Sequence, residues 1–292
     1  MGFGDFILHR PDSLAEACRL GREFGAGAAY VAGGTDLLVD LRSGRKSFEH
    51  LIALRDLAEL REIRRDGDVL HIGALATLNE IAESAAVHGH FPALAEAIAT
   101  MAGRQIRNQA TMGGNFSCGV PCSDTPPITC AAGGSIAVTG ADGEREIAAG
   151  DFVLAPRSTV LQAGEIVTAI RIPKQPATSG ACFERFSLRR GSALAVASVA
   201  VWVNCAAGVI ADARVVMGAV GPVPLFAERC AAAVIGQAPG EALFAEAGRI
   251  AAEEAQPISD LRGSEQYRRE VVAVLTRRAL AAAVARAKGG NR

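Results

Sequence analysis

The chain has 292 residues, enough for about two domains with hydrophobic cores. Its 30 basic residues nearly balance its 31 acidic residues, so the charge favours neither nucleic acid nor a membrane surface as a partner. The amino terminus lacks the pattern of a secretory signal, and polar residues interrupt the most apolar stretch, residues 193–221, so neither export nor membrane insertion is expected. Seven scattered cysteines do not resemble a secreted disulfide framework, which predicts a reducing, cytoplasmic compartment.

The first predicted element is a helix over residues 11–25, because Ser13 and Glu16 are spaced to form a capping box and a glycine follows the apolar positions. The next stretch, residues 28–32, is short, apolar and partly β-branched, which predicts a buried strand. This strand leads directly into a glycine turn.

A second strand is predicted at residues 51–54. Residues 68–81 change from strand alternation to helical spacing near Thr77, and residues 92–109 carry one apolar face along a predicted helix. Short strands with turn signals fill residues 135–172, where an Ala-Asp-Gly sequence predicts a hairpin turn.

The best candidate for a domain boundary is the stretch 173–181, which is rich in Pro, Ser and Gly. Strand alternation beyond it predicts an antiparallel meander, followed by two alanine-rich helices. The last helix is predicted to begin near Ser264. Its outward face is expected to carry four arginines, Arg268, Arg269, Arg277 and Arg278.

Several familiar motifs are absent from the sequence. Residues 25–30 begin like a dinucleotide fingerprint but precede a strand instead of following one, and no complete phosphate loop, H-E-x-x-H or G-x-S-x-G motif occurs. The histidines form no ligand pattern. Cys118, Cys122 and Cys130 are spaced unlike zinc or iron–sulfur ligands, so small thiols that fill space beside a loop are favoured over a cluster, and no metal is expected on this chain.

Two glycine pairs, Gly33–Gly34 and Gly113–Gly114, are each followed by small polar side chains. Turns without Cβ atoms let backbone N–H groups approach a pyrophosphate, and they do not require a lysine. Either pair alone is typical of an ordinary turn. Together they favour a dinucleotide held between two loops.

The sequences "VAGGTDLL" (31–38) and "QATMGGNFS" (109–117) resemble the two flavin-pyrophosphate loops of a known family. This family is the FAD-binding medium subunit of the molybdenum hydroxylases, the group that includes xanthine dehydrogenase and carbon monoxide dehydrogenase. The resemblance extends essentially from end to end. Four further segments resemble the family in the expected order, at residues 70–81, 164–173, 183–201 and 258–280.

The resemblance implies an α+β protein with a vanillyl-alcohol-oxidase-type (PCMH-type) FAD-binding domain over residues 1–175. This domain would contain two small α/β subdomains, at about residues 1–60 and 61–175. A carboxy-terminal α+β domain with an antiparallel sheet, residues 176–288, would close over the flavin.

The resemblance also implies which residues hold FAD. In the family, the Asp of an S-D-x-x-P run contacts the adenosine half of FAD, and Asp124 after Ser123 stands at that place. The residues expected to wrap the pyrophosphate, chiefly through backbone amides, are Val31, Ala32, Gly33, Gly34, Thr35 and Asp36 in the first loop and Thr111, Gly113, Gly114 and Asn115 in the second. The residues expected to line the cofactor are Ala102, Ile106, Ile166 and Val167.

Two positions depart from the family pattern. Arg185 stands where relatives usually have a Lys near the isoalloxazine, so the positive charge is kept on a planar group. Ala193 stands where many relatives have an Asp, so any polar link made by that Asp is expected to be absent. Asn115 reaches Asp124 without an insertion, which argues against the extra iron–sulfur cluster that some relatives carry there.

The resemblance implies an oxidoreductase subunit that carries FAD and transfers electrons. A large partner subunit would hold the molybdenum cofactor and a small one two [2Fe-2S] clusters, in a dimer of heterotrimers. The FAD would pass electrons to NAD+, O2 or another acceptor, and no side chain of this chain need be catalytic. The alternatives are a self-sufficient flavin oxidase or reductase, with Tyr30 or His71 as the nearest acid/base candidates, and a non-enzymatic nucleotide-binding protein.

Overall fold

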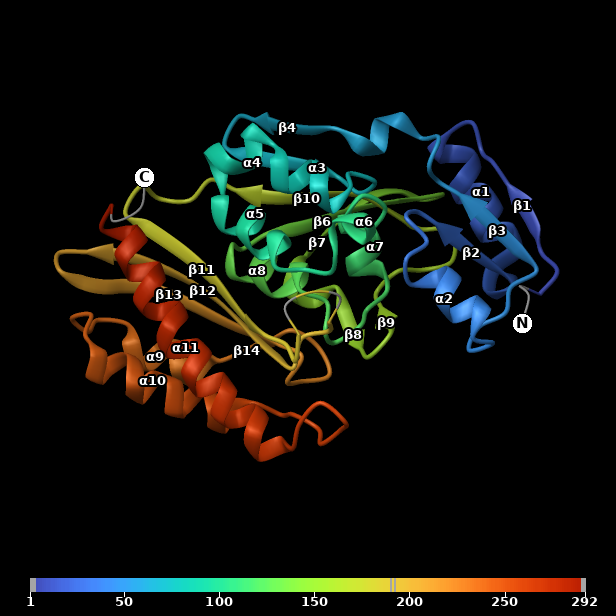
Figure 1. The fold of residues 1–292 in the computed structure, drawn as a ribbon. Helices are drawn as coiled ribbons and strands as arrows, with labels where there is room; N and C mark the ends of the chain where they lie inside the picture. The colour runs from blue at the N-terminus through green and yellow to red at the C-terminus, as the bar shows by residue number, and fades with distance from the viewer. Residues whose placement is uncertain (1–3, 190, 192, 290–292) are drawn as a thin grey trace.

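The computed structural model describes residues 4–289 except residues 190 and 192. It is an α+β protein built around three main sheets, which follow one another along the chain and through the molecule (Figure 1). A parallel three-stranded sheet lies at one end, an antiparallel five-stranded sheet in the middle, and an antiparallel four-stranded sheet with the carboxy-terminal helices at the other end.

The first sheet has the strand order β1 (Ile7–His9), β3 (His50–Ala53), β2 (Ala28–Val31), and both pairs are parallel. Helix α1 (Leu14–Phe24) connects β1 to β2, and α2 (Leu37–Arg42) connects β2 to β3. The glycine turn predicted after residues 28–32 lies between β2 and α2. A small separate core holds this region together.

Helix α1 begins and ends where the local signals predict. The Ser13 hydroxyl accepts a hydrogen bond from the Glu16 N–H at 3.2 Å, and Gly25, with φ 49°, ends the helix. The Glu16 carboxylate accepts from the Asp12 N–H at 2.9 Å instead of the Ser13 N–H. The predicted capping box is therefore only half formed.

The middle sheet has the order β4 (Ile63–Asp66), β5 (Val69–Gly73), β10 (Ile166–Pro173), β6 (Ser135–Gly140), β7 (Gly143–Ala148), with all neighbours antiparallel. The predicted hairpin turn joins β6 to β7 and is confirmed. Five helices between β5 and β6 share a core with this sheet: α3 (Leu78–Glu83), α4 (Ala85–His90), α5 (Pro92–Ala99), α7 (Met112–Ser117) and α8 (Thr125–Ala131). The short α6 (Arg104–Arg107) lies between α5 and α7 and buries none of its residues. The remaining short elements are η1 (Gly25–Gly27), η2 (Ala58–Arg61), η3 (Ala149–Asp151), β8 (Val153–Ala155) and β9 (Ser158–Thr159).

The single helix predicted over residues 92–109 is wrong. The chain leaves helical geometry between α5 and α6, where Ala102 has φ 43° in the left-handed region. The Arg107 guanidinium holds this break by donating to the carbonyl oxygens of Met101 at 2.6 Å and Ala102 at 3.4 Å. Hydrogen bonds from a side chain to the main chain therefore override the helical periodicity of this stretch.

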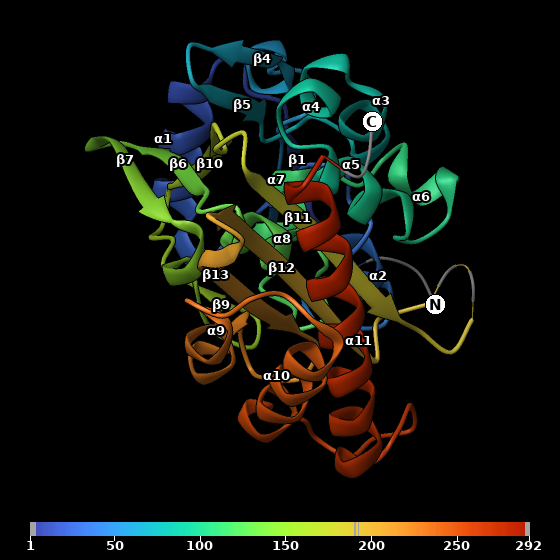
Figure 2. The same cartoon turned by 90° about the vertical axis from the view of Figure 1, so that its left-hand side faces the viewer.

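The third sheet is the predicted meander, with the order β11 (Ser179–Phe186), β12 (Ala197–Ala206), β13 (Val209–Gly218), β14 (Leu225–Phe226). Successive side chains of β12 point to opposite faces of the sheet and therefore enter different cores. Ala200 and Trp202 join the core of the middle sheet. The side chains that alternate with them pack against the carboxy-terminal helices. Those helices are α9 (Glu228–Val234), α10 (Glu241–Glu254) and α11 (Glu265–Ala287). Figure 2 shows α11 lying across β11 and β12.

Two predictions for the carboxy-terminal helices are wrong. Three helices follow the meander where two were predicted, because the chain turns between α9 and α10. Arg268 was expected on the outer face of α11, but only 2% of it is exposed. Its guanidinium donates to the carbonyl oxygens of Val196 at 3.0 Å and Ala219 at 3.2 Å, and to the Asp260 carboxylate at 2.5 Å. Two loops distant in sequence and the nearby Asp260 thus accept hydrogen bonds from the buried charge, while its Nε atom has no partner in the described part of the chain.

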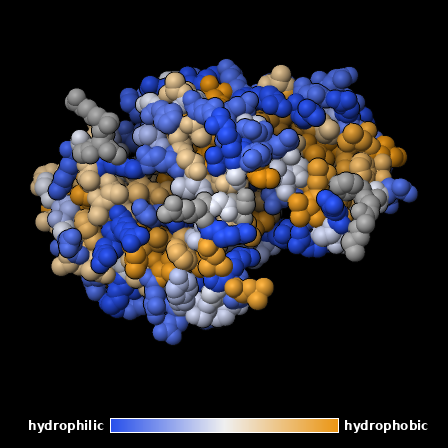
Figure 3. All heavy atoms as spheres, viewed as in Figure 1, coloured by the Kyte–Doolittle hydropathy of each residue, from blue (hydrophilic) through white to orange (hydrophobic). Residues whose placement is uncertain are grey.

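Hydrophobic side chains gather on the surface at the end of the molecule formed by β1 and β3 (Figure 3). Phe6, Ile7 and Leu8 are 39%, 59% and 54% exposed, although β1 is an edge strand. Exposed apolar residues on an open edge are typical of a surface that another polypeptide covers. In the part of the chain that the structure describes, no helix has both the length and the apolar character of a membrane span.

Candidate cofactor-binding site

A cavity of about 310 Å³ lies where the first and middle sheets meet. Its walls come from the turn after β2, from the segment that begins α7, and from the start of β10, so it brings both predicted loops together. The predicted site residues that line it are Ala32, Gly33, Gly34, Thr35, Asp36, Thr111, Gly113, Gly114, Asn115, Ile166 and Val167. Val31 ends β2 and lies beside the lining residues of the cavity.

The glycines let the two loops approach each other and the middle sheet. A Cβ atom at Gly33 would overlap the carbonyl oxygen of Gln109, and one at Gly113 would lie 2.6 Å from the Cβ atom of Ala74. Gly114 differs, because a Cβ there would meet only the Thr111 hydroxyl, at 3.0 Å. Two of the glycines are therefore required by contacts within the protein, and Gly114 is adjacent to free space.

The two loops differ in the hydrogen bonds of their backbone amides. Within residues 4–189, 191 and 193–289, the N–H groups of residues 33–36 donate no hydrogen bond. In the second loop, the Gly113 N–H donates to the Ala74 carbonyl at 3.0 Å and the Gly114 N–H to the Thr111 hydroxyl at 3.1 Å. Unpaired N–H groups beside a cavity are suited to an anion such as a diphosphate. The first loop therefore has these donors available, and the second loop has largely used its own, although both were expected to offer backbone amides to the pyrophosphate.

The second loop is held in place from two sides. Thr111 forms an isolated β-bridge with Thr77 and caps α7 through its side chain. The Asn115 side-chain oxygen accepts hydrogen bonds from the Thr125 hydroxyl at 2.7 Å and from the Thr125 N–H at 3.3 Å. This oxygen therefore serves the fold, and the amide nitrogen is the part of the Asn115 side chain left for a ligand.

Replacing Asn115 with alanine is expected to destabilise the protein by about 1–3 kcal/mol, because the fully buried Thr125 hydroxyl would lose its acceptor. Urea denaturation of the FAD-free chain measures this loss. The control is Gln105→Ala, at an exposed position of α6, which is expected to change stability by less than about 0.5 kcal/mol. Equal stability of the two variants would contradict the assigned role of Asn115.

A charged cluster at the cavity was missed by the sequence reasoning. The Asp40 carboxylate, 5% exposed, pairs with Arg45 at 2.9 Å and with Arg157 at 2.9 Å. Asp36 lies nearby, and burial, then the charge of Asp40, raises its pKa, which Arg157 partly opposes. Asp40 and Arg157 are 117 positions apart, so no local pattern in the sequence relates them.

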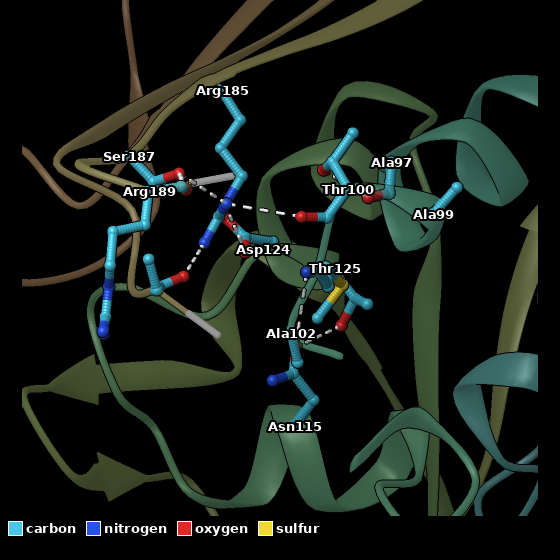
Figure 4. A network of polar contacts seen from close by, with 12 residues as sticks. Ala97, Ala99, Thr100, Ala102, Asn115, Asp124, Thr125, Arg185, Ser187 and Arg189 are labelled. Atoms are coloured by element: carbon cyan, nitrogen blue, oxygen red, sulfur yellow. Dashed lines mark hydrogen bonds and ion pairs between the residues drawn. The ribbon is translucent and has the colours of Figure 1, made fainter. Parts of the chain in front are cut away.

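A buried ion pair lies outside the lining of this cavity (Figure 4). The Arg185 Nε donates to Asp124 Oδ2 at 2.9 Å, and their side chains are 7% and 6% exposed. The guanidinium also donates to the Thr100 carbonyl at 3.3 Å and to the Ala193 carbonyl. At position 193, where the family Asp is absent, the main-chain carbonyl accepts this hydrogen bond from Arg185.

The Asp124 carboxylate is incompletely satisfied. In the described part of the chain its Oδ1 atom is buried without a hydrogen-bond partner. Burial raises the pKa of Asp124 to about 6, although Arg185 acts to lower it. A buried acceptor without a donor costs free energy unless a ligand supplies one. Asp124 Oδ1 is therefore a candidate contact for a hydroxyl or N–H group of a ligand.

The ion pair changes the expected arrangement along FAD. Asp124 was expected at the adenosine half and Arg185 beside the isoalloxazine, yet their side chains are 2.9 Å apart. They cannot contact opposite ends of an extended cofactor. Ala102 lies beside this pair at the break before α6 (Figure 4). The other two predicted residues lie away from the cavity lining: Ile106 is 46% exposed, and the buried Ser123 hydroxyl lies 3.5 Å from the Cys118 sulfur.

Two groups considered as acids or bases have other roles. The Tyr30 hydroxyl donates to the Ala17 carbonyl at 3.2 Å, and burial raises its pKa, so the phenol is a packing group at the cavity wall. His71 lies within β5, where burial, then Arg64 and Arg171, lower its pKa.

The seven cysteines are free thiols. Cys118 lines the cavity and donates to the Asn115 carbonyl at 3.2 Å, while burial raises its pKa and that of Cys122, and raises the pKa of Cys130 to about 12. Among the residues with described placement, no group of three or more His, Cys, Asp or Glu side chains is arranged to hold a metal ion.

Comparison with known proteins identifies the class of this chain. A family model described as the FAD binding domain in molybdopterin dehydrogenase matches residues 3–175, and one described as the CO dehydrogenase flavoprotein C-terminal domain matches residues 182–283. The chain therefore belongs to the family of FAD-binding subunits of molybdopterin-dependent dehydrogenases. It is an oxidoreductase subunit, and its cofactor is FAD.

The similarity extends over whole chains. The carbon monoxide dehydrogenase medium chain of Afipia carboxidovorans is 34% identical over 98% of this chain and 99% of its own. The xanthine dehydrogenase FAD-binding subunit of Escherichia coli O157:H7 is 29% identical over 96% of this chain and 97% of its own. A crystal structure of Cu,Mo-CO dehydrogenase superposes with a TM-score of 0.94 at 33% identity, covering 98% and 100% of the two chains. Quinoline 2-oxidoreductase from Pseudomonas putida 86 gives a TM-score of 0.93 at 27% identity, covering 99% of each chain.

Proposed function

We propose that this chain takes electrons from a [2Fe-2S] subunit through its FAD and passes them to NAD+, O2 or another acceptor, within a heteromeric molybdenum hydroxylase. The observation that carries the proposal is the row of unpaired N–H groups at residues 33–36 beside the main cavity, in a chain whose family binds FAD. FAD when bound supplies the reversible uptake and release of electrons.

The residues of this chain would bind and orient the cofactor. We propose that the N–H groups of residues 33–36 hydrogen-bond the diphosphate, with Gly114 leaving room for it on the opposite side. Ile166 and Val167, at the start of β10, would supply an apolar wall. We propose that the remaining predicted residues also contact FAD. They match FAD-binding positions of the family, and they lie around this cavity or around Arg185.

We further propose that Asp124 and Arg185 lie together at the isoalloxazine end of FAD. Arg185 reaches across from β11 of the third sheet, and its ion pair ties that sheet to the segment before α8. Asp124 Oδ1 would accept a hydrogen bond from the cofactor, and the carboxylate would balance the charge of Arg185. This arrangement supports assigning residues 1–175 to FAD binding and residues 176–288 to a domain that closes the site.

We also propose a large molybdenum-cofactor subunit and a small [2Fe-2S] subunit as partners, in a dimer of heterotrimers. Relatives that align over nearly their whole length are named as medium chains or subunits, which supports partner chains. The exposed apolar residues of β1 provide a surface suited to such a contact. Seven free cysteines support a reducing compartment, and we place the complex in the cytoplasm.

Co-purification tests this proposal. The tagged chain, recovered from its own cells, is expected to bring down two further polypeptides, with FAD, molybdenum and iron in the complex. The chain expressed alone is expected to bind FAD but not to oxidise the substrate of the complex. Substrate oxidation by the isolated chain at the rate of the complex would instead show a self-sufficient flavoenzyme.

A further inference from the structure

A second cavity, of about 270 Å³, lies on the other side of the first glycine loop. It shares Ala32, Gly33, Leu75 and Thr111 with the main cavity, so these residues form a common wall. The close approach of Gly33 to the Gln109 carbonyl lies in this wall and brings the two loops into contact. The second cavity is therefore adjacent to the main cavity.

The walls of this cavity are polar and positively charged. Arg55 and Arg61 line it together with Thr77, Asn108 and Gln109. In the described part of the chain, neither arginine forms an ion pair with a carboxylate, and the Arg61 Nη2 donates to the Arg55 carbonyl at 3.1 Å. No acidic residue lines the cavity among the residues that the structure describes.

The charges around the cavity contrast with those nearby on the same chain segment. Arg10 pairs with Asp56 at 3.0 Å, and Arg64 pairs with Glu62 at 2.8 Å. Asp56 and Glu62 are thus engaged by other cations, and in the described part of the chain neither Arg55 nor Arg61 pairs with a carboxylate. Two guanidinium groups with free N–H donors at a polar cavity are suited to binding phosphate oxygens.

We propose that the cavity lined by Arg55 and Arg61 binds a phosphate or pyrophosphate group of a small-molecule ligand other than FAD. Both arginines have exposed side chains, so the rest of such a ligand can remain in solvent while its anionic group enters the cavity. The cavity is large enough for a phosphate or pyrophosphate group.

We do not expect this cavity to bind the diphosphate of FAD. The N–H groups of residues 33–36 provide unpaired donors for that diphosphate, and the loop that carries them lines the main cavity. The close approach of Gly33 to the Gln109 carbonyl lies in the wall that the two cavities share. The inference is therefore independent of where the isoalloxazine lies.

The test is calorimetric titration of the FAD-loaded full-length chain with inorganic pyrophosphate, at constant ionic strength. We expect saturable binding of one pyrophosphate per chain with FAD still bound. The variant Arg55→Gln/Arg61→Gln is expected to bind pyrophosphate at least about tenfold more weakly, because two charge-assisted hydrogen-bonding groups are removed. Its FAD content, read from flavin absorbance, is expected to stay at the wild-type level.

A matched variant controls for net charge. Arg65→Gln/Arg277→Gln removes the same two charges from exposed positions outside both cavities and is expected to bind pyrophosphate like the wild type. Equal weakening in both double variants, or no saturable binding to the wild type, would overturn the proposal. Release of FAD by pyrophosphate from the wild type but not from Arg55→Gln/Arg61→Gln would also overturn it, by showing that the arginines bind the FAD diphosphate. The first two results concern pyrophosphate alone and leave FAD binding by the first loop unaffected.

Discussion

Replacing Gly33 with alanine is expected to remove FAD from the protein and to lower its stability by about 1–3 kcal/mol, the usual cost of overpacking. The new Cβ would overlap the Gln109 carbonyl oxygen, so the two loops must separate. Their separation would displace the N–H groups of residues 33–36, which we assign to the diphosphate. Flavin absorbance per chain and urea denaturation measure the two effects.

Gly89 provides the matched control for this change. It lies in α4, and a Cβ there meets no atom within 4 Å. Gly89→Ala is therefore expected to keep full FAD content and to be at least as stable as the wild type. Full FAD content in Gly33→Ala would show that the contact between the loops is not needed to hold the cofactor.

Replacing Arg185 with methionine is expected to destabilise the protein by about 3–5 kcal/mol near neutral pH, because it leaves the buried Asp124 carboxylate without its cation. Urea denaturation at two pH values tests this expectation. Asp124 already has its pKa raised to about 6 in the folded protein, from an ordinary value of 3.8. Removing Arg185 raises this pKa further.

The pH dependence of the Arg185→Met effect follows from that shift. A carboxyl group with a raised folded pKa binds protons more tightly in the folded state, so its contribution to stability improves as the pH falls toward its unfolded pKa. The loss is therefore expected to be largest above about pH 6 and clearly smaller near pH 5, where Asp124 becomes protonated.

Two further variants separate the effect of charge from other effects of the substitution. Arg19→Met breaks an exposed ion pair with Glu23 and is expected to cost less than about 1 kcal/mol at both pH values. The double variant Asp124→Asn/Arg185→Met is expected to be more stable than Arg185→Met, because no uncompensated charge remains. An equal loss at both pH values would show that the pair contributes packing instead of charge balance.

The sequence predicted those parts of the fold that depend on neighbouring residues. Ser13 and Gly25 mark the ends of α1, and the change from strand to helix near Thr77 occurs where Thr77 caps α3. The family resemblance placed both glycine loops in one site, and eleven of the predicted residues line one cavity. These signals are local in the chain or carried by motifs.

The features that were missed depend on specific side-chain contacts, most of them between distant segments. The break at Ala102 is held by Arg107, five positions further along the chain. Arg268 is buried because carbonyls of two distant loops accept its hydrogen bonds. The ion pair of Asp124 with Arg185 joins residues 61 positions apart. Helical periodicity and charge alone carry no information on such partners, so an arginine on α11 was assigned to solvent.

The sequence also could not predict that the two loops differ in the hydrogen bonds of their backbone amides. Both glycine pairs look alike in the chain, yet Gly113 packs against Ala74 and donates its N–H there. The first loop lies in a turn between β2 and α2, and in the described part of the chain the N–H groups of residues 33–36 donate to no carbonyl. Sequence similarity of two loops therefore did not mean equal roles.

A crystal structure of this chain with bound FAD is the most direct test of the central claim. We predict diphosphate oxygens within hydrogen-bonding distance of backbone N–H groups in residues 33–36, with the Arg55–Arg61 cavity free of the cofactor. A diphosphate bound at Arg55 and Arg61, or one without contact to the first loop, would contradict the account.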